Sequence, residues 1–268
     1  MKKEHESLDN LLAIVAKLRD PVHGCPWDRK QTFASLVPHT LEEAYEVADV
    51  IERQAISELP GELGDLLFQI AFYAQLGQEQ SQFTFNDVVN AISEKLVRRH
   101  PHVFAESELT DETQLRVQWE QLKAEERRQQ PGQAHSVLDD IPRLLPALSR
   151  AKKLQQRCSA VGFDWQALPP VVDKIHEELE EVLAEVAAPT QDPERIADEL
   201  GDVLFACVNL VRHLKQDPEA VLRRANDKFE RRYRQVEQLL QQQGKASQDC
   251  SEAELDRYWQ QVKAGEQP

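Results

Sequence analysis

Hydrophobic positions recur along almost the whole chain with the three- and four-residue spacing of amphipathic helices. Helix start signals accompany this pattern, because an aspartate precedes a proline at 192–193 and at 217–218, and Ser251 with Glu254 forms a capping-box sequence. The sequence therefore predicts an all-α fold. The predicted helices span residues 8–19, 36–53, 57–77, 85–99, 111–129, 142–158, 168–187, 193–214, 218–243 and 252–264.

The two halves of the chain repeat one another. Each half contains an EExxE segment followed by an ExxD segment, beginning at Glu42 and Glu62 in the first half and at Glu177 and Glu199 in the second. Two further pairs follow in the same order in each half: Lys95 and Arg99 then Trp119 and Lys123, and Lys228 and Arg232 then Trp259 and Lys263. Four blocks in one order at a nearly constant offset indicate an internal duplication. We predict an N-terminal repeat at 1–130, a polar linker at 131–140 and a C-terminal repeat at 141–268.

Composition narrows the range of functions. The 268 residues include 32 basic and 47 acidic ones, and the resulting net charge of −15 argues against nucleic acid as the main partner. Only 9 glycines are present, and neither the GxGxxG nor the GxxxxGK[ST] phosphate-binding motif occurs. No apolar run is long enough to span a membrane. The 4 widely spaced cysteines, without a CxxC motif, are typical of a reduced, cytoplasmic protein.

The repeated carboxylates indicate a metal site. Side chains three or four residues apart share a helix face, and the short spacing between the two acidic motifs allows a helical hairpin that opposes their acidic faces. Four carboxylates so close repel each other unless a cation lies between them, and oxygen ligands suit Mg²⁺ or Mn²⁺. A solvated acidic face is disfavoured because apolar residues flank Glu62 and Glu199 on both sides of their helices.

Cationic and aromatic residues follow the acidic motifs. Lys228 and Arg232 lie one helical turn apart and are interpreted as a clamp for substrate phosphates, although such a pair can also be a solvated face. Trp259 is a candidate for stacking on a base or, equally, a core residue, with Lys263 one turn further on. The counterparts of the phosphate clamp in the first half are Lys95 and Arg99.

At these residues the sequence resembles a known family. The duplicated acidic motifs, the KFERR and WQQVK segments, and the strings at 23–28 and 98–104 are similar to MazG-type nucleoside triphosphate pyrophosphohydrolases. The resemblance covers nearly the whole chain. It implies tandem four-helix-bundle-like units, a homodimer, Mg²⁺ dependence, and hydrolysis of NTPs and dNTPs to the nucleoside monophosphate and pyrophosphate.

The resemblance also implies roles for individual residues. The implied metal ligands are Glu178, Glu181, Glu199 and Asp202, with Glu43, Glu46, Glu62 and Asp65 as their counterparts in a second, weaker site. The implied nucleotide contacts are Lys174, Lys228, Arg232 and Trp259. Together with the carboxylate chemistry, these assignments predict attack of a metal-positioned water on the α-phosphorus. Glu177, beside the ligand set, is a candidate base or an orienting residue.

The two copies differ in charge next to the acidic motifs. Lys174 and Arg195 each precede an acidic position by one turn in the second copy, where the first copy has His39 and Glu58. If these positions face the site, the second copy attracts a triphosphate more strongly. We therefore predict that the C-terminal copy is the main catalytic one.

Three alternatives remain open on the sequence alone. The chain is a non-enzymatic helical interaction or regulatory module, a narrower all-α pyrophosphohydrolase of the dUTPase or phosphoribosyl-ATP type, or a carboxylate di-iron bundle. The cationic pairs disfavour the first, the tandem layout disfavours the second, and the missing Glu-x-x-His pairing at both acidic motifs disfavours the third. Helices 57–77 and 193–214 are apolar over most of their circumference, which predicts a homodimer or a larger homo-oligomer.

Overall fold

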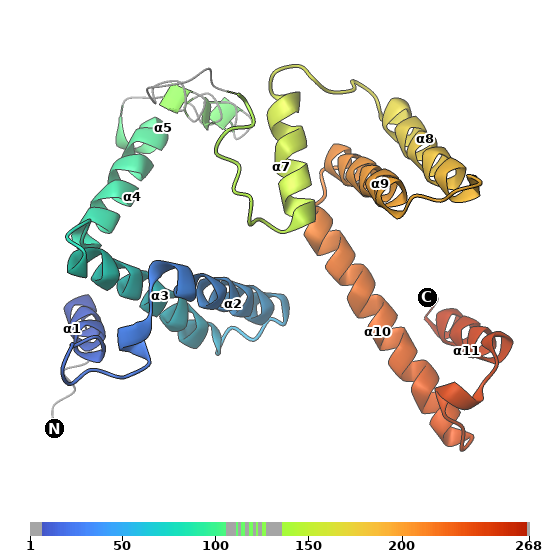
Figure 1. Ribbon diagram of the computed structural model, residues 1–268, viewed down its shortest axis with the longest axis horizontal. Coiled ribbons are helices and arrows are strands. Elements are labelled where there is room, and N and C mark those ends of the chain that lie inside the picture. The colour runs from blue at the N-terminus through green and yellow to red at the C-terminus, as the bar shows by residue number, and fades with distance from the viewer. Residues whose placement is uncertain are drawn as a thin grey trace. The chain divides into compact units, whose positions relative to one another are not determined.

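The computed structural model describes residues 7–105, 111, 114–115, 118–119, 122, 125–126 and 136–266. The chain forms two compact units, Met1–Pro131 and Gly132–Pro268. All regular elements in the described ranges are helical, which confirms the predicted all-α class (Figure 1). No helix in these ranges combines the length and the apolar character that a membrane crossing requires.

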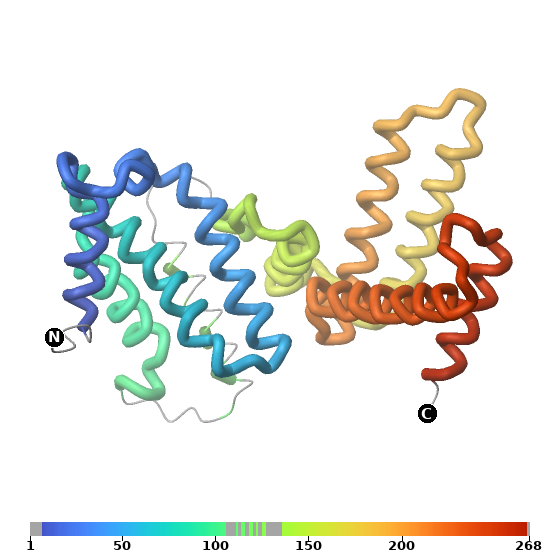
Figure 2. Tube along the Cα trace, turned by 90° about the horizontal axis from the view of Figure 1, so that it is seen from below, coloured from blue at the N-terminus to red at the C-terminus, as the bar shows by residue number. Residues whose placement is uncertain are grey.

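The first unit is built around a hairpin of two long helices. Helix α2 packs against α3, and α3 also contacts α1 and α4 (Figure 2). Helix α2 begins three residues before its predicted start because Thr32 and Ser35 form a capping box. The helices of this unit are α1 (Leu8–Leu18), α2 (Phe33–Glu52), α3 (Leu59–Glu79), α4 (Phe85–Arg99) and the short α5 (Pro101–Phe104).

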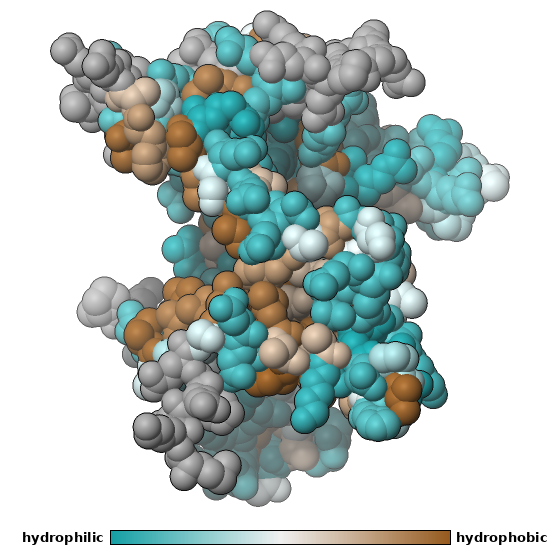
Figure 3. Space-filling view, turned by 90° about the vertical axis from the view of Figure 1, so that its left-hand side faces the viewer, coloured by the Kyte–Doolittle hydropathy of each residue, from teal (hydrophilic) through white to brown (hydrophobic). Residues whose placement is uncertain are grey.

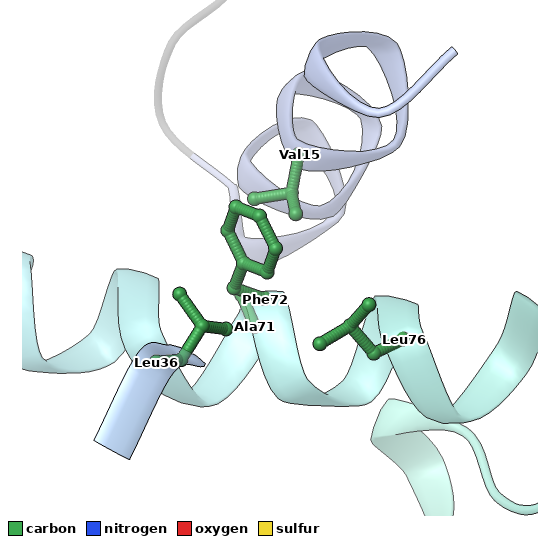
Figure 4. Packing of buried hydrophobic residues seen from close by; sticks show 5 residues of the cluster. All are labelled: Val15, Leu36, Ala71, Phe72 and Leu76. Atoms are coloured by element: carbon green, nitrogen blue, oxygen red, sulfur yellow. The ribbon is translucent and has the colours of Figure 1, made fainter. Parts of the chain in front are cut away.

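The core of the first unit fixes α3 against its neighbours. Phe72 on α3 is fully buried, and its ring points toward Val15 of α1 (Figure 4). Leu36 of α2 lies on the other side of the same cluster, with Ala71 and Leu76 of α3. Burying a large apolar side chain contributes about 1.5–3 kcal/mol. This packing sets the side of α3 that faces α2, and hence the direction of the acidic motif on α3.

The second unit contains the corresponding hairpin. Helices α8 and α9 pack closely along their lengths, α7 contacts α9 and α10, and α11 folds back on the far half of α10 (Figure 1). The predicted aspartate caps are present, because Asp192 accepts from the Glu194 amide and Asp217 from the Ala220 amide, both at 3.0 Å. The helices are α7 (Ala147–Ser159), α8 (Leu168–Ala187), α9 (Pro193–His213), α10 (Pro218–Gln242) and α11 (Glu252–Gly265).

Two clusters hold the helices of the second unit. Val236, Leu240, Tyr258 and Val262 form the buried contact between α10 and α11. Asp164, in the connection between α7 and α8, accepts hydrogen bonds from Arg212 at 2.6 Å and His213 at 3.0 Å near the end of α9. Partial burial opposes ionisation of Asp164, but these hydrogen bonds outweigh it and hold its pKa well below the usual range.

The start of one predicted helix differs in the structure. Helix α7 begins at Ala147 rather than at 142, because Pro146 is its extended N-cap and disfavours helical backbone at the residue before it. The predicted helix at 111–129 and the predicted linker at 131–140 lie largely or partly outside the described residues.

Both units expose apolar side chains. Figure 3 shows brown, hydrophobic residues at the surface of the face that it displays. On the α8–α9 hairpin, the exposed apolar residues form stripes along each helix, spaced by one helical turn. The residues of these stripes include Leu179, Leu183 and Val186 on α8, and Leu200 and Leu204 on α9.

Candidate active site

Three carboxylates of the second unit meet across the α8–α9 hairpin. Glu178 lies on α8, and Glu199 and Asp202 lie one turn apart in the first half of α9. One oxygen from each side chain lies within 4.8 Å of the others. Because α8 and α9 are antiparallel and joined by a short connection, residues near the end of one helix face residues near the start of the next. We call this cluster the second acidic centre.

Glu178 is the buried member of this centre. Its side chain is 8% exposed, and the Lys174 Nζ lies 2.7 Å from its Oε1. The same Nζ donates to Glu177 Oε1 at 2.7 Å, so that Lys174 bridges two carboxylates on its own helix. The hydrogen bonds that Lys174 donates to Glu177 and Glu178 raise the pKa of Lys174 above its usual value. A buried carboxylate is costly unless it is paired, and Lys174 supplies the pairing charge.

Glu181 lies one turn after Glu178 and is exposed to solvent. Partial removal from water, a hydrogen bond with Glu178 and repulsion from Glu178 and Glu199 raise the pKa of Glu181. Its carboxyl group is therefore close to the second acidic centre, although it lies outside the group of three oxygens. A divalent cation at this position would relieve the repulsion. The donor set consists only of carboxylate oxygens, which fits Mg²⁺ or Mn²⁺.

The first unit contains the equivalent cluster, which we call the first acidic centre. Glu43 of α2 and Glu62 and Asp65 of α3 place carboxylate oxygens within 4.8 Å of one another. Glu46, one turn after Glu43, has a raised pKa because of partial removal from water, a hydrogen bond with Glu43 and repulsion from neighbouring carboxylates. The duplication seen in the sequence is thus present in the geometry of the side chains.

The two centres differ in the side chain that pairs with the glutamate of the first helix of the hairpin, which is Glu43 on α2 and Glu178 on α8. Glu43 accepts a long hydrogen bond, 3.4 Å, from the amide of Gln69, a side chain that is buried on α3. His39, in the position of Lys174, instead lies 3.7 Å from Glu42. The first centre therefore has a neutral amide where the second has an ammonium group. Sequence reasoning missed Gln69, because a lone glutamine on an apolar helix face carries no motif.

Arg195 forms an ion pair with Glu185 near the loop end of the hairpin. Its side chain is 64% exposed, and Glu185 lies one turn beyond Glu181 on α8. In the first unit, Glu58 pairs at 3.0 Å with Arg53, at the end of α2. The cation at Arg195 is thus held beside the acidic face of α8 by a carboxylate outside the second acidic centre.

The other candidate residues lie on α10 and α11. The Arg232 guanidinium lies 5.9 Å from the centre of the Trp259 ring, and the Phe229 ring lies 5.3 Å from it. Trp259 is half-buried against the core of α10 and α11, while Lys228 and Lys263 are exposed. Helix α11 packs on the part of α10 that points away from the α8–α9 hairpin (Figure 1). Within one chain, this cationic group does not contact the second acidic centre among the described residues.

A carboxylate joins this cationic group in both copies. Glu266 pairs with Arg232 at 2.8 Å and with Arg231 at 3.3 Å, and Glu126 pairs with Arg99 and with Arg98. Lys95 is exposed, and Lys123 lies outside the described residues. The sequence carried a signal for these glutamates, because each follows the repeated tryptophan by seven residues.

The fold and the site define an all-α protein with two copies of a helical hairpin, each carrying a cluster of carboxylates suited to a divalent cation. The MazG nucleotide pyrophosphohydrolase domain matches the chain twice, at residues 31–104 and 168–237, which include both hairpins. The chain belongs to this family.

Named relatives support the assignment, two of them over nearly the full length of the chain. The chain is 52% identical over 259 residues to a nucleoside triphosphate pyrophosphohydrolase of Escherichia coli K12, covering 97% of this chain and 98% of that protein. It is 40% identical over 267 residues to the nucleoside triphosphate pyrophosphohydrolase/pyrophosphatase MazG of Thermotoga maritima, covering both chains fully. A Mycobacterium tuberculosis protein with the first of these names is 36% identical over 172 residues, covering 63% of this chain and 50% of that protein.

Proposed function

We propose that this protein hydrolyses nucleoside triphosphates, both NTPs and dNTPs, to the nucleoside monophosphate and pyrophosphate. The observation that carries the proposal is the meeting of Glu178, Glu199 and Asp202 at the second acidic centre of a MazG-family chain. Relatives with similarity along the whole chain carry the name of this activity. A triphosphate needs positive charge to compensate its own negative charge. The carboxylates of this centre can hold a divalent cation that supplies the positive charge.

The acidic residues would hold Mg²⁺, or Mn²⁺, against the triphosphate. When bound, this ion neutralises charge on the phosphate oxygens and activates a water for attack on the α-phosphorus. Glu178, Glu199 and Asp202, together with the neighbouring Glu181, would provide the ligands, and Lys174 adds a positive charge beside Glu178. Glu177 is held by Lys174, which favours an orienting role for Glu177 over that of a free base.

The cationic group of α10 and α11 would bind the rest of the nucleotide. Lys228, Arg232 and Lys263 supply charge for phosphates, and Trp259 supplies an aromatic surface. Since this group lies away from the second acidic centre of the same chain, a second copy must bring the two together. The apolar stripes on α8 and α9 are the surface that a second hairpin would cover to complete a four-helix bundle. The functional unit we propose is therefore a homodimer.

The test is product identification. All eight NTPs and dNTPs are incubated with the purified protein and Mg²⁺, and nucleoside monophosphate and pyrophosphate are measured together. We expect equimolar release of both products, abolished by EDTA. Release of inorganic phosphate and nucleoside diphosphate instead would contradict attack at the α-phosphorus. No turnover of any of the eight nucleotides would favour a non-enzymatic helical module.

A further inference from the structure

One carboxylate at the end of α11 joins two consecutive arginines of α10. Arg232 Nε donates to Glu266 Oε2 at 2.8 Å, and Arg231 Nε donates to Glu266 Oε1 at 3.3 Å. Glu266 and Arg232 are both largely shielded from solvent, with side chains 23% and 19% exposed. Charge-assisted hydrogen bonds of this kind are stronger than neutral ones and fix the plane of the guanidinium group.

Glu266 contacts Arg232 through Nε, the guanidinium nitrogen nearest the aliphatic part of the side chain. The outer edge of the guanidinium is formed by the two terminal nitrogens. Only Nε is used, and among the described residues no hydrogen bond occupies the two terminal nitrogens, Nη1 and Nη2. The guanidinium is held over the Trp259 ring at the same time. Glu266 therefore fixes the side chain without using the outer edge, which has the geometry to take two phosphate oxygens.

The first copy has the same carboxylate in a different geometry. Glu126 is engaged by Arg99 through both Nε and Nη2, and by Arg98 through Nε. Arg99 thus offers a smaller free edge than Arg232. A glutamate occurs at the same distance from the repeated tryptophan in both copies. This recurrence argues against a chance contact at Glu266.

We propose that Glu266 is a positioning residue for nucleotide binding, which holds Arg232 over Trp259 with its terminal nitrogens turned toward a substrate phosphate. This inference rests on the proposed function, in which Arg232 contacts the nucleotide. The physical reason is preorganisation: an arginine side chain loses much rotamer freedom when it binds an anion, and Glu266 removes that freedom in advance.

The test is steady-state kinetics of Glu266→Gln and Glu266→Ala. We expect KM to rise about five- to thirtyfold in Glu266→Gln, and further in Glu266→Ala, with kcat within about twofold of the parent. The matched control is Glu230→Gln, which removes the exposed Glu230–Arg234 pair on α10 and should leave both constants unchanged. Circular dichroism and thermal unfolding check that α11 remains docked.

Arg232→Ala, alone and combined with Glu266→Gln, separates a failure of the proposed function from a failure of this inference. Arg232→Ala alone should raise KM at least as much as Glu266→Gln, and the two changes together should add nothing further. If Arg232→Ala leaves KM unchanged, the assignment of Arg232 in the proposed function fails, and this inference with it. If Arg232→Ala raises KM but Glu266→Gln leaves it unchanged or lowers it, only the inference is overturned. A loss of kcat and thermal stability at constant KM would also overturn it.

Discussion

At the scale of single residues, the carboxylates around the second acidic centre repel one another, and the buried Glu178 is paired with the ammonium group of Lys174. Glu178 is paired with Lys174, but Glu181, Glu199 and Asp202 have no cation of this kind within the described chain. Repulsion of Glu181 from Glu178 and Glu199 is the local condition that favours a divalent ion. Removing one charge should therefore reduce both the repulsion and the affinity for metal.

The first prediction follows from this balance. Asp202→Asn keeps the size of an exposed side chain and removes the charge that would hold Mg²⁺. We expect kcat/KM for pyrophosphate release to fall about a hundredfold or more, with an unchanged circular dichroism spectrum. Glu180→Gln, on the same hairpin but turned away from Glu178 on α8, is the matched loss of one charge and should leave activity intact. Parent-like activity of Asp202→Asn at saturating Mg²⁺ would refute its assignment as a ligand.

The second prediction concerns pH. The pKa of Glu181 is raised in the folded chain above its ordinary value of 4.5, so the folded state takes up a proton more readily than the unfolded state. The metal-free protein therefore loses stability as pH rises through this window. Glu181→Gln should raise the Tm in EDTA at pH 8, and this advantage should shrink as pH falls toward 4.5. Equal Tm values for parent and variant at pH 8, measured by differential scanning fluorimetry, would show that the repulsion does not affect folding.

At the scale of helices, the hairpin is the unit that carries the chemistry. Its two acidic faces could be predicted from the sequence because helical periodicity places residues three and four apart on one side, and a short loop forces the next helix to run back. The helix caps at Asp192, Asp217 and Ser251 could also be predicted, because each joins residues only two or three positions apart. The structure confirms these caps.

Contacts between helices were harder to predict. Gln69 joins Glu43 only because α3 is rotated to face α2, and that rotation is set by the packing of Phe72. Glu266 reaches Arg232 only because α11 folds back on α10. Side chains with several rotamers can choose among partners on neighbouring helices, and a single sequence does not state which partner is chosen.

The third prediction compares the two hairpins. Lys174 bears a full charge beside the second acidic centre, whereas the first has Gln69 and a histidine. A unit charge about 6 Å from a phosphate contributes roughly 3 kcal/mol at an effective dielectric constant near 20. We expect the double alanine variant of Glu199 and Asp202 to lose about a hundredfold in kcat/KM. The matched double alanine variant of Glu62 and Asp65 should lose less than about tenfold. Equal losses in the two variants would mean that the copies contribute equally.

At the scale of the whole molecule, a chain with two centres exposes more apolar helix surface than one hairpin can cover. Leu183 and Leu204 are 66% and 60% exposed on α8 and α9. Burial of such stripes against a second copy is the ordinary way in which a two-helix layer becomes a bundle. In the homodimer that we propose, the cationic group of α10 and α11 of one chain would lie at the second acidic centre of the other.

The last prediction tests this exchange between chains. Asp202→Asn impairs the acidic centre and Arg232→Ala impairs the cationic group, so each homodimer alone should have little activity at a substrate concentration well below the parent KM. When the two variants are coexpressed, half of the dimers are mixed, and each mixed dimer has one site with both groups intact. We therefore expect about a quarter of the parent activity, a value that follows from twofold symmetry. If each site were built from one chain, every site would lack one group, and the mixture would be no more active than the separate variants. Light scattering on the same preparations should show dimers or larger species, and a stable monomer at micromolar concentration would contradict the proposed assembly.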